Sequence, residues 1–225
     1  MKKFLALFCC VILTLTIFSG CKKGNDQLLN FTKPKAGDTV ATMETSMGNI
    51  KLMFFKQVAP KAVENFLTHA KDGYYDNLIF HRVINNFMIQ SGDPLGTGTG
   101  GQSIWGKPFK NEVSDQARNF RGALAMANSG KDTNGSQFYI VQAGPVSASA
   151  LANVESQYGI KLTQEEKDKY EQVGGAPWLD GGYTVFGQVI EGMDVVDKIA
   201  SVQTDSNDKP LTAVTVNKIT VETVK

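Results

Sequence analysis

The sequence contains few of the side chains that most often bind metal ions or form disulfides. Of its 225 residues, three are cysteine and two are histidine. Cys9 and Cys10 precede Cys21, so the chain after residue 21 has no cysteine with which to form an internal disulfide. His69 and His81 lie twelve residues apart in different predicted elements, and no cysteine cluster accompanies them. We therefore expect no structural zinc site and no other metal.

The sequence also lacks a strong excess of either charge. It carries 23 basic and 22 acidic side chains, a formal net charge of +1, and the part after residue 20 has a net charge of −1. Proteins that bind nucleic acids through the phosphates need a basic patch. Because the chain has no long run of lysine or arginine, we expect no nucleic-acid partner.

Two common catalytic motifs are missing as well. Residues 91–106 contain six glycines, a density as high as that of a phosphate-binding loop. The lysine and serine or threonine that end such a loop, and the helix that follows it, are absent. No Gly-x-Ser-x-Gly segment supplies a hydrolytic nucleophile. The glycines indicate instead a surface loop whose backbone borders a binding groove.

What the sequence does have begins with an apolar N-terminal segment. Met1-Lys2-Lys3 is a short positive region, and residues 4–18 carry no charge. This run is shorter than the roughly 20 apolar residues that span a membrane. With the small residues Ser19-Gly20 behind it, it predicts a secretory signal.

Gly20-Cys21 resembles the lipobox of bacterial lipoproteins, in which the cysteine is lipidated and becomes the first residue. Phe18 is a departure, because that position usually holds leucine or another aliphatic residue. We expect a signal peptide at 1–20, a lipidated Cys21 with a flexible tether at 21–36, and a domain at 37–225 anchored to the membrane outside the cytoplasm. The alternative is ordinary secretion with cleavage near Gly20.

The remaining chain is rich in short segments typical of strands. They are residues 40–45, 50–55, 79–84, 87–91, 123–127, 137–142, 183–190 and 213–224, and turn residues separate them. One helix is predicted to begin at Ala59-Pro60 and to end at Asp72-Gly73, and a second occupies 193–200. This pattern predicts a mainly-β fold, closed into a barrel.

Residues 143–176 differ in composition from the strands around them. They hold many charges and helix formers. Thr163, with Glu166 three residues later, matches a capping box at the start of a helix. We expect a helical insertion here, with one mostly solvated face.

Residues 78–90 are the most apolar stretch after the N-terminus, yet they include Arg82 and Gln90. Asn85-Asn86 separates two strand-like runs, which predicts a hairpin. Alternation would put Arg82 on the same face as Phe80. A cation and an amide among apolar side chains cost free energy unless a partner or a ligand binds them. The alternative is a surface arginine whose aliphatic stem covers the strand.

Further along the chain, polar and aromatic residues suited to a groove recur. The full set is Arg82, Gln90, Asn128 and Gln137, with Phe87, Met88, Phe138, Tyr139, Trp178, Leu179 and Tyr183. Such a set suits recognition of an extended peptide with an apolar residue in a pocket. Core packing is the alternative for each aromatic residue taken alone.

Four motifs follow one another along the chain: residues 80–93, which begin Phe80-His81-Arg82, residues 98–106, residues 124–128 continuing into 133–140, and Trp178-Leu179-Asp180-Gly181 with residues 185–187. In sequence and order they resemble the motifs of the cyclophilin-type peptidyl-prolyl cis-trans isomerases. The resemblance covers residue 39 to the C-terminus. It implies an eight-stranded antiparallel barrel closed by two helices, with the insertion near 143–176 added.

The resemblance also implies the site residues. Arg82 takes the place of the family's catalytic arginine, and Gln90 and Asn128 would bind the substrate backbone. The implied substrate-binding positions are Phe87, Met88, Tyr139 and Leu179 in a proline pocket, Ala127, Gln137 and Trp178 in the neighbouring groove, Gly98 on its rim, and Phe138 and Tyr183. The implied partners are proline-containing polypeptides and a cyclosporin-type inhibitor, with no cofactor, and the protein is expected to be a monomer.

Two positions depart from the best-known eukaryotic pattern of the family. Tyr139 replaces a phenylalanine, which would add a hydroxyl at the pocket. Tyr183 replaces a histidine. Both positions keep a ring, so the resemblance still implies activity.

The expected mechanism follows from amide chemistry. The X–Pro bond rotates over a barrier of roughly 18–20 kcal/mol because its nitrogen donates into the carbonyl. A hydrogen bond from Arg82 to that nitrogen would withdraw its lone pair from conjugation and favour the twisted state. Such a step needs neither a nucleophile nor a cofactor. The alternative function is a peptide-binding module or holdase chaperone of the same fold with little turnover.

Overall fold

The structure is a computed structural model that describes residues 27–225. The predicted signal peptide and the predicted lipidation of Cys21 lie outside the described residues. The strands are β1 Thr39–Thr45, β2 Gly48–Phe54, β3 Leu78–Ile79, β4 Arg82–Ile84, β5 Met88–Ser91, β6 Ala123–Met126, β7 Phe138–Val141, β8 Val185–Glu191 and β9 Thr215–Thr223. The α-helices are α1 Pro60–Lys71, α2 Ala148–Tyr158, α3 Gln164–Val173 and α4 Met193–Ala200, with 3-10 turns at Leu29–Phe31 and Pro177–Leu179.

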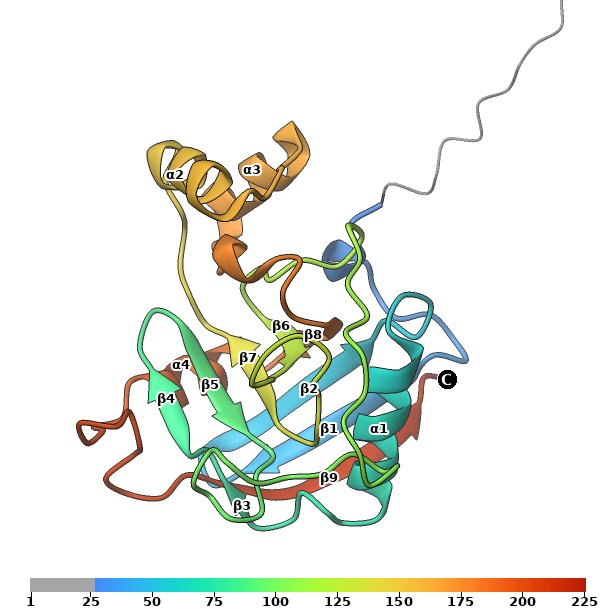
Figure 1. The fold of residues 1–225 in the computed structure, drawn as a ribbon. Coiled ribbons are helices and arrows are strands. Elements are labelled where there is room, and N and C mark those ends of the chain that lie inside the picture. Colours follow the sequence, from blue (N-terminus) through green and yellow to red (C-terminus); the bar gives the residue numbers. More distant parts are fainter. Residues whose placement is uncertain (1–26) are drawn as a thin grey trace, which may run out of the picture.

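The strands form one antiparallel sheet in the order β3-β9-β1-β2-β8-β6-β7-β5-β4 (Figure 1). The fold is an open half-barrel of nine strands, so the prediction of a closed eight-stranded barrel is wrong. The predicted strand 79–84 is split at Phe80-His81 into β3 and β4, which stand at opposite ends of this order. Phe80 N–H donates to Val214 O at 2.9 Å and His81 N–H to Gln90 O at 3.1 Å. The two edge strands β3 and β4 are therefore joined through the backbone at Phe80-His81, but among residues 27–225 they do not pair with each other by strand hydrogen bonds.

The predicted helix boundaries are confirmed, together with their chemistry. Pro60 opens α1, where its missing N–H is harmless. α3 begins with the predicted capping box, in which Thr163 and Glu166 each bind the other's backbone N–H. α2 is capped at its N-terminus by Ser147, whose hydroxyl accepts from Ala150 N–H, and at its C-terminus by Gly159, which has a φ of 66°. The expected helical insertion thus contains α2 and α3.

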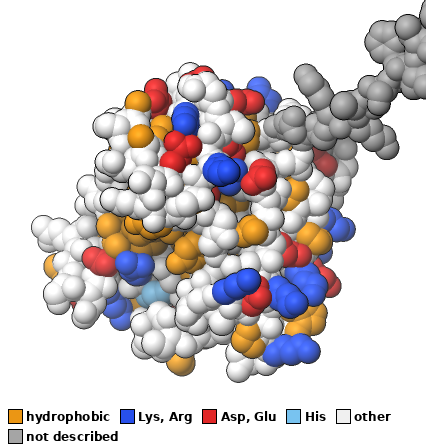
Figure 2. Space-filling model, turned by 45° about the horizontal axis from the view of Figure 1, so that its top comes forward, with side chains coloured by type: hydrophobic (Ala, Val, Ile, Leu, Met, Phe, Trp, Pro, Cys, Tyr) orange, Lys and Arg blue, Asp and Glu red, His pale blue; other side chains and the backbone are white. Residues whose placement is uncertain are grey.

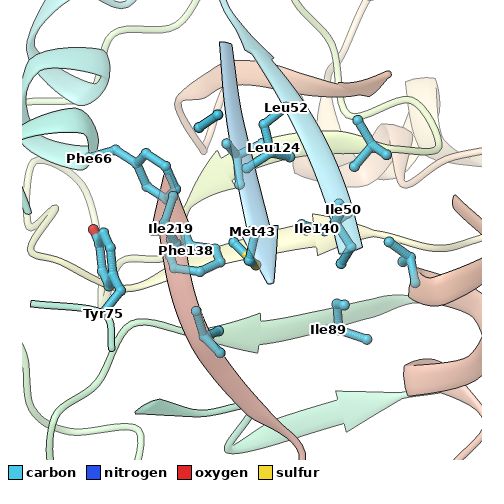
Figure 3. Close-up of a cluster of buried hydrophobic side chains, with 14 of the residues drawn as sticks. Met43, Ile50, Leu52, Phe66, Tyr75, Ile89, Leu124, Phe138, Ile140 and Ile219 are labelled. Carbon is cyan, nitrogen blue, oxygen red and sulfur yellow. The ribbon is translucent and has the colours of Figure 1, made fainter. Parts of the chain in front are cut away.

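The main core lies between the inner face of the sheet and helices α1 and α4. Phe66 of α1 is fully buried, and Figure 3 shows it reaching toward Phe138 and the sheet. Its ring centroid lies 5.1 Å from that of Tyr75 and 5.3 Å from that of Phe138. Helix α1 therefore covers the inner face largely through this aromatic cluster.

The insertion has a small core of its own. It consists of the buried side chains Leu28, Phe120, Leu151, Leu162 and Tyr170. The rings of Phe120 and Tyr170 lie 4.2 Å apart, which packs α3 onto the loop before β6. Figure 1 shows α2 and α3 standing together outside the sheet, beyond one end of β7.

Residues 27–36, the described part of the predicted tether, pack against the body. Leu29 N–H donates to Gln116 O at 2.8 Å, and Asn30 is 5% exposed. The Asn30 side chain donates to Arg118 O and to Gln188 Oε1. Leu28, Leu29 and Asn30 therefore belong to the folded body, although the prediction places them in the tether. No helix within residues 27–225 is long and apolar enough to cross a membrane.

Phe66→Ala is expected to lower the free energy of unfolding by about 3–5 kcal/mol, because it leaves a cavity at the centre of the aromatic cluster. Leu211→Ala is a matched control, since Leu211 is 65% exposed, and its effect should stay within about 0.5 kcal/mol. Denaturant unfolding measures both variants. Similar losses in the two would contradict this view of the core.

Candidate active site

The candidate site lies on the outer side of the β4–β5 hairpin. Arg82 is paired directly opposite Gln90, so the two side chains share one face. The prediction that Arg82 shares a face with Phe80 is wrong: Phe80 is fully buried, whereas 45% of the Arg82 side chain is exposed. The break at residues 80–81 resets the alternation, and Val83 becomes the inward residue of β4.

Nine predicted site residues enclose a cavity of about 150 Å³. They are Arg82, Phe87, Met88, Gln90, Ala127, Asn128, Tyr139, Leu179 and Tyr183. An engineered apolar cavity of roughly this volume, about 150 Å³, binds benzene, so this one accommodates a single small ring. We call it the ring pocket. Figure 2 shows apolar side chains gathered on this face below the insertion, with charged side chains beside them.

Arg82 is oriented by a carboxylate that the sequence did not reveal. Its Nε lies 3.5 Å from Asp208 Oδ2, and both side chains are more than two-fifths exposed. A pair this exposed contributes at most about 1 kcal/mol, so it directs the side chain more than it stabilises the fold. Val83 N–H donates to Asp208 O at 2.8 Å and fixes the turn. Within residues 27–225 the Nη atoms of Arg82 have no partner, which leaves them available to a ligand.

Gln90 is held by a relay of amides. Its Nε2 donates to Gln137 Oε1 at 2.8 Å. Gln137 Nε2 donates in turn to Gly98 O at 3.1 Å and to Gly100 O at 2.7 Å. The structure thus brings the predicted residues Gln90, Gln137 and Gly98 together and ties β5 to the glycine-rich loop.

Asn128 follows β6 with its side chain engaged and its backbone free. Its Oδ1 accepts from Gly130 N–H at 3.2 Å, and its Nδ2 lies 3.4 Å from Gly182 O. Its own N–H and carbonyl make no backbone hydrogen bond within the described part of the chain. An extended peptide can pair with such a segment through main-chain hydrogen bonds.

A second hollow of about 350 Å³ adjoins the ring pocket. It is lined by Gln90, Gly98, Thr99, Gly100, Gly101, Ala127, Asn128, Ser129, Thr133, Gly135 and Gln137. Three of these residues, Gln90, Ala127 and Asn128, also line the ring pocket. We call this hollow the glycine-lined hollow, and with the ring pocket it forms one groove.

The glycine-rich loop is organised on Asp93, a residue that sequence reasoning missed. Asp93 is 1% exposed, and its carboxylate accepts from the N–H groups of Leu95, Thr97, Gly98 and Gly100. Burial opposes the charge, but these four donors outweigh it and lower the pKa of Asp93. Gly101 has a φ of 95°, and a Cβ there would lie 2.2 Å from Ser136 Oγ. The loop therefore needs glycine at that position.

The Tyr139 hydroxyl was predicted to lie at the ring pocket, but it points away from it. It donates to Asn119 Oδ1 at 2.7 Å in the protein interior. Asn119 donates through N–H and Nδ2 to Asp180 Oδ1, and Tyr170 of α3 donates to Asp180 Oδ2 at 2.7 Å. Burial raises the pKa of Tyr139, of Tyr170 and of Asp180. A buried network thus links the pocket floor to the insertion, and the ring alone faces the cavity.

Two predicted site residues lie outside the groove. Phe138 is fully buried in the main core beside Phe66, because its neighbour Tyr139 takes the outward position of β7. Trp178 is not in the lining of the ring pocket, and its ring centroid lies 5.7 Å from that of Phe87. Trp178 lines a different hollow, next to the insertion.

His81 lies beneath the groove and is 5% exposed, and neither ring nitrogen has a hydrogen-bond partner among the described residues. Burial lowers the pKa of this imidazole, which keeps it neutral at pH 7. Within residues 27–225 no three His, Cys, Asp or Glu side chains are grouped so as to hold a metal ion.

Comparison with known proteins agrees with this geometry. Residues 40–221 match the family model described as cyclophilin type peptidyl-prolyl cis-trans isomerase/CLD. A protein of Staphylococcus aureus (strain USA300) named as a peptidyl-prolyl cis-trans isomerase is 48% identical over 186 residues, which are 83% of this chain and 93% of that protein. One of the same name from Staphylococcus saprophyticus is 48% identical over 179 residues, which are 80% and 89% of the two chains.

Solved structures give the same relation. A cyclophilin-type isomerase of Cryptosporidium parvum superposes with a TM-score of 0.67 at 31% identity and covers 84% of this chain and 99% of its own. A second structure of that protein, determined in the presence of the dipeptide Ala-Pro, gives a TM-score of 0.66 at 31% identity over 82% and 99% of the chains. The half-barrel fold, the groove and these relatives lead to one conclusion: the chain belongs to the cyclophilin-type peptidyl-prolyl cis-trans isomerases.

Proposed function

We propose that this isomerase acts on X–Pro bonds of polypeptides outside the cytoplasm and that Arg82 is its catalytic residue. The ring pocket takes the proline ring, and the glycine-lined hollow takes the chain on one side of it. The observation that carries this proposal is the juxtaposition of a ring-sized cavity with the unpartnered Nη atoms of Arg82. A relative crystallised in the presence of Ala-Pro supports the same class of ligand.

The site has to lower the barrier to rotation about the X–Pro amide bond. The prolyl nitrogen is conjugated with the preceding carbonyl, and this conjugation creates the rotation barrier of roughly 18–20 kcal/mol. As the bond twists, the lone pair localises on nitrogen and becomes a better hydrogen-bond acceptor. A donor from Arg82 is then stronger in the twisted state than in either planar state, and only such a difference accelerates the step.

Rotation also needs one part of the substrate to stay still. The ring pocket holds the proline, and the free backbone groups of Asn128 hold the adjoining chain. Gln90 is fixed by Gln137, so it positions a substrate carbonyl without first losing its own freedom. The carbonyl of the X–Pro amide, between the proline in the ring pocket and the chain held by Asn128, is then the group that turns.

A holdase or peptide-binding module is the second candidate. The volume of the hollow beside the insertion, about 990 Å³, favours it, because binding without turnover needs surface and no catalytic group. The orientation of Arg82 by Asp208 favours the enzyme, since a binding surface has no need of a positioned cation. A proline-isomerisation assay distinguishes the two functions.

Arg82→Ala is expected to lower kcat/KM for an Ala-Pro peptide by about 100-fold or more, the effect of losing one positioned donor. Arg82→Lys is the conservative comparison and should recover little, because lysine lacks the planar fork. The melting temperature of both variants should match that of the wild type, since Arg82 is exposed. Wild-type turnover no faster than the uncatalysed rate would favour the holdase.

The predicted mechanism contains no group that titrates near neutral pH. Because burial lowers the pKa of His81, kcat/KM should be flat between about pH 6.5 and 8.5. A bell-shaped profile near neutrality would contradict the mechanism.

Below this range the unfolded chain binds the His81 proton more readily than the folded one, so stability falls as the pH falls. His81→Gln should remove the part of this fall in stability that comes from His81, as measured by denaturant unfolding at several pH values.

We further propose that Cys21 carries a lipid that anchors the isomerase to the outer side of the cytoplasmic membrane. The support is the positive start, the uncharged run at 4–18 and Gly20-Cys21. Cys21→Ser should move the protein from the membrane fraction to the soluble fraction while its isomerase activity persists. Unchanged retention of Cys21→Ser in membranes would overturn the lipid anchor.

A further inference from the structure

A hollow of about 990 Å³ lies beneath the insertion, and the proposed mechanism does not use it. One wall is the end of α2 and the loop to α3, from Tyr158 to Thr163, and another is the turn that contains Trp178 and residues 180–182. Leu28, Asp115, Gln116 and Arg118, with Glu165 and Glu166 in the first turn of α3, complete the lining. We call this hollow the insertion groove.

The insertion groove adjoins the ring pocket: the ring centroid of Trp178, which lines the groove, lies 5.7 Å from that of Phe87, which lines the pocket. Consecutive residues of one turn divide between them: Trp178 and Asp180 line the groove, whereas Leu179 and Tyr183 line the pocket. The glycine-lined hollow meets the same pocket through Gln90 and Ala127. A chain with its proline in the ring pocket therefore has two neighbouring hollows that can receive its flanks.

The insertion groove is held rigidly relative to the ring pocket. Tyr170 of α3 and Asn119 both donate to the buried carboxylate of Asp180, the central residue of the dividing turn. Arg118 and Glu166 form a second buried pair between the loop before β6 and α3. Partners joined by such satisfied networks keep their relative positions. A ligand that spans both hollows loses little additional freedom on binding.

The lining indicates what the groove binds. Tyr158 is 57% exposed, and Ile160 and Trp178 are half-buried, so aromatic and apolar surface is available to a ligand. Glu165 and Lys161 are exposed at the rim, and Asp115 pairs there with Arg118 at 3.1 Å. With Glu166 and Asp180, the lining has four acidic side chains against two basic ones, so it is acidic overall. An aromatic side chain suits the first feature, and a basic neighbour suits the second.

We propose that the insertion groove is a further subsite of this isomerase, which binds the client chain on the side of the proline away from the glycine-lined hollow. Its preferred ligand is an aromatic residue next to a lysine or arginine. This inference rests on the proposed function, because it assumes that the client proline occupies the ring pocket. The insertion then selects clients, and the barrel performs the reaction.

The test compares matched peptides on the full-length protein. Each contains Ala-Pro and a Phe-Lys pair placed at successive positions on either side of the proline, and its match has Ala-Ser in place of Phe-Lys. Affinity is measured by titration calorimetry. On one side of the proline, at the spacing that reaches the groove, the Phe-Lys peptide should bind about tenfold tighter than its match.

Tyr158→Ala should abolish this tenfold preference and leave the affinity of the Ala-Ser match unchanged. Glu165→Gln should weaken the Phe-Lys peptide only, whereas Glu171→Gln is its control, because it lies on the same helix away from the lining. Leu211→Ala controls for loss of an exposed apolar side chain.

Three results would overturn the proposal. The wild type could bind both peptides equally at every spacing. Tyr158→Ala could weaken both peptides alike. Sedimentation could reveal a dimer that Tyr158→Ala dissociates, which would assign the groove to a second copy of the chain. Turnover of the short Ala-Ser match tests the proposed function separately, because that peptide has no side chain for the groove.

Discussion

The arrangement of the site depends on the hydrogen bonds to the buried carboxylate of Asp180. A buried carboxylate costs several kcal/mol unless donors satisfy it, and here Asn119 and Tyr170 do so. Asn119 also accepts from Tyr139 in the floor of the ring pocket. The barrel, the pocket wall and the insertion helix α3 therefore meet at one group, and none of the three can move without leaving a buried polar atom unpaired.

Around Asp180, polar groups that already have hydrogen-bond partners shape the groove, whereas polar groups without partners are available to the substrate. The hydrogen bonds to Asp93 and the one between Gln90 and Gln137 hold the groove in shape. The Nη atoms of Arg82 and the backbone of Asn128 have no partner among the described residues and face the groove. A site prepared in this way loses little freedom when a peptide binds, which is a requirement for positioning an amide as it rotates.

Much of the site could be predicted from sequence because its residues follow local rules. The β4–β5 hairpin, with Asn85-Asn86 in its loop, places Phe87 and Met88 beside the site, and nine of the expected site residues line the ring pocket. Phe138 was predicted as a site residue, yet the structure buries it in the main core; four consecutive apolar residues in β7 show no alternation from which its face could be inferred. The partners Asp208 and Asn119 were missed because no local pattern connects them to Arg82 or Tyr139.

The sequence by itself determined the chemistry and the local elements: helix ends at Pro60 and Thr163, an insertion of different composition, and one arginine in an apolar hairpin. These depend on neighbours within a few residues, where steric and hydrogen-bonding preferences act. Only the tertiary structure decided that the sheet stays open at Phe80-His81, that the Tyr139 hydroxyl points inward, and that the insertion borders the ring pocket. Those outcomes depend on contacts between distant segments, which pattern and propensity do not encode.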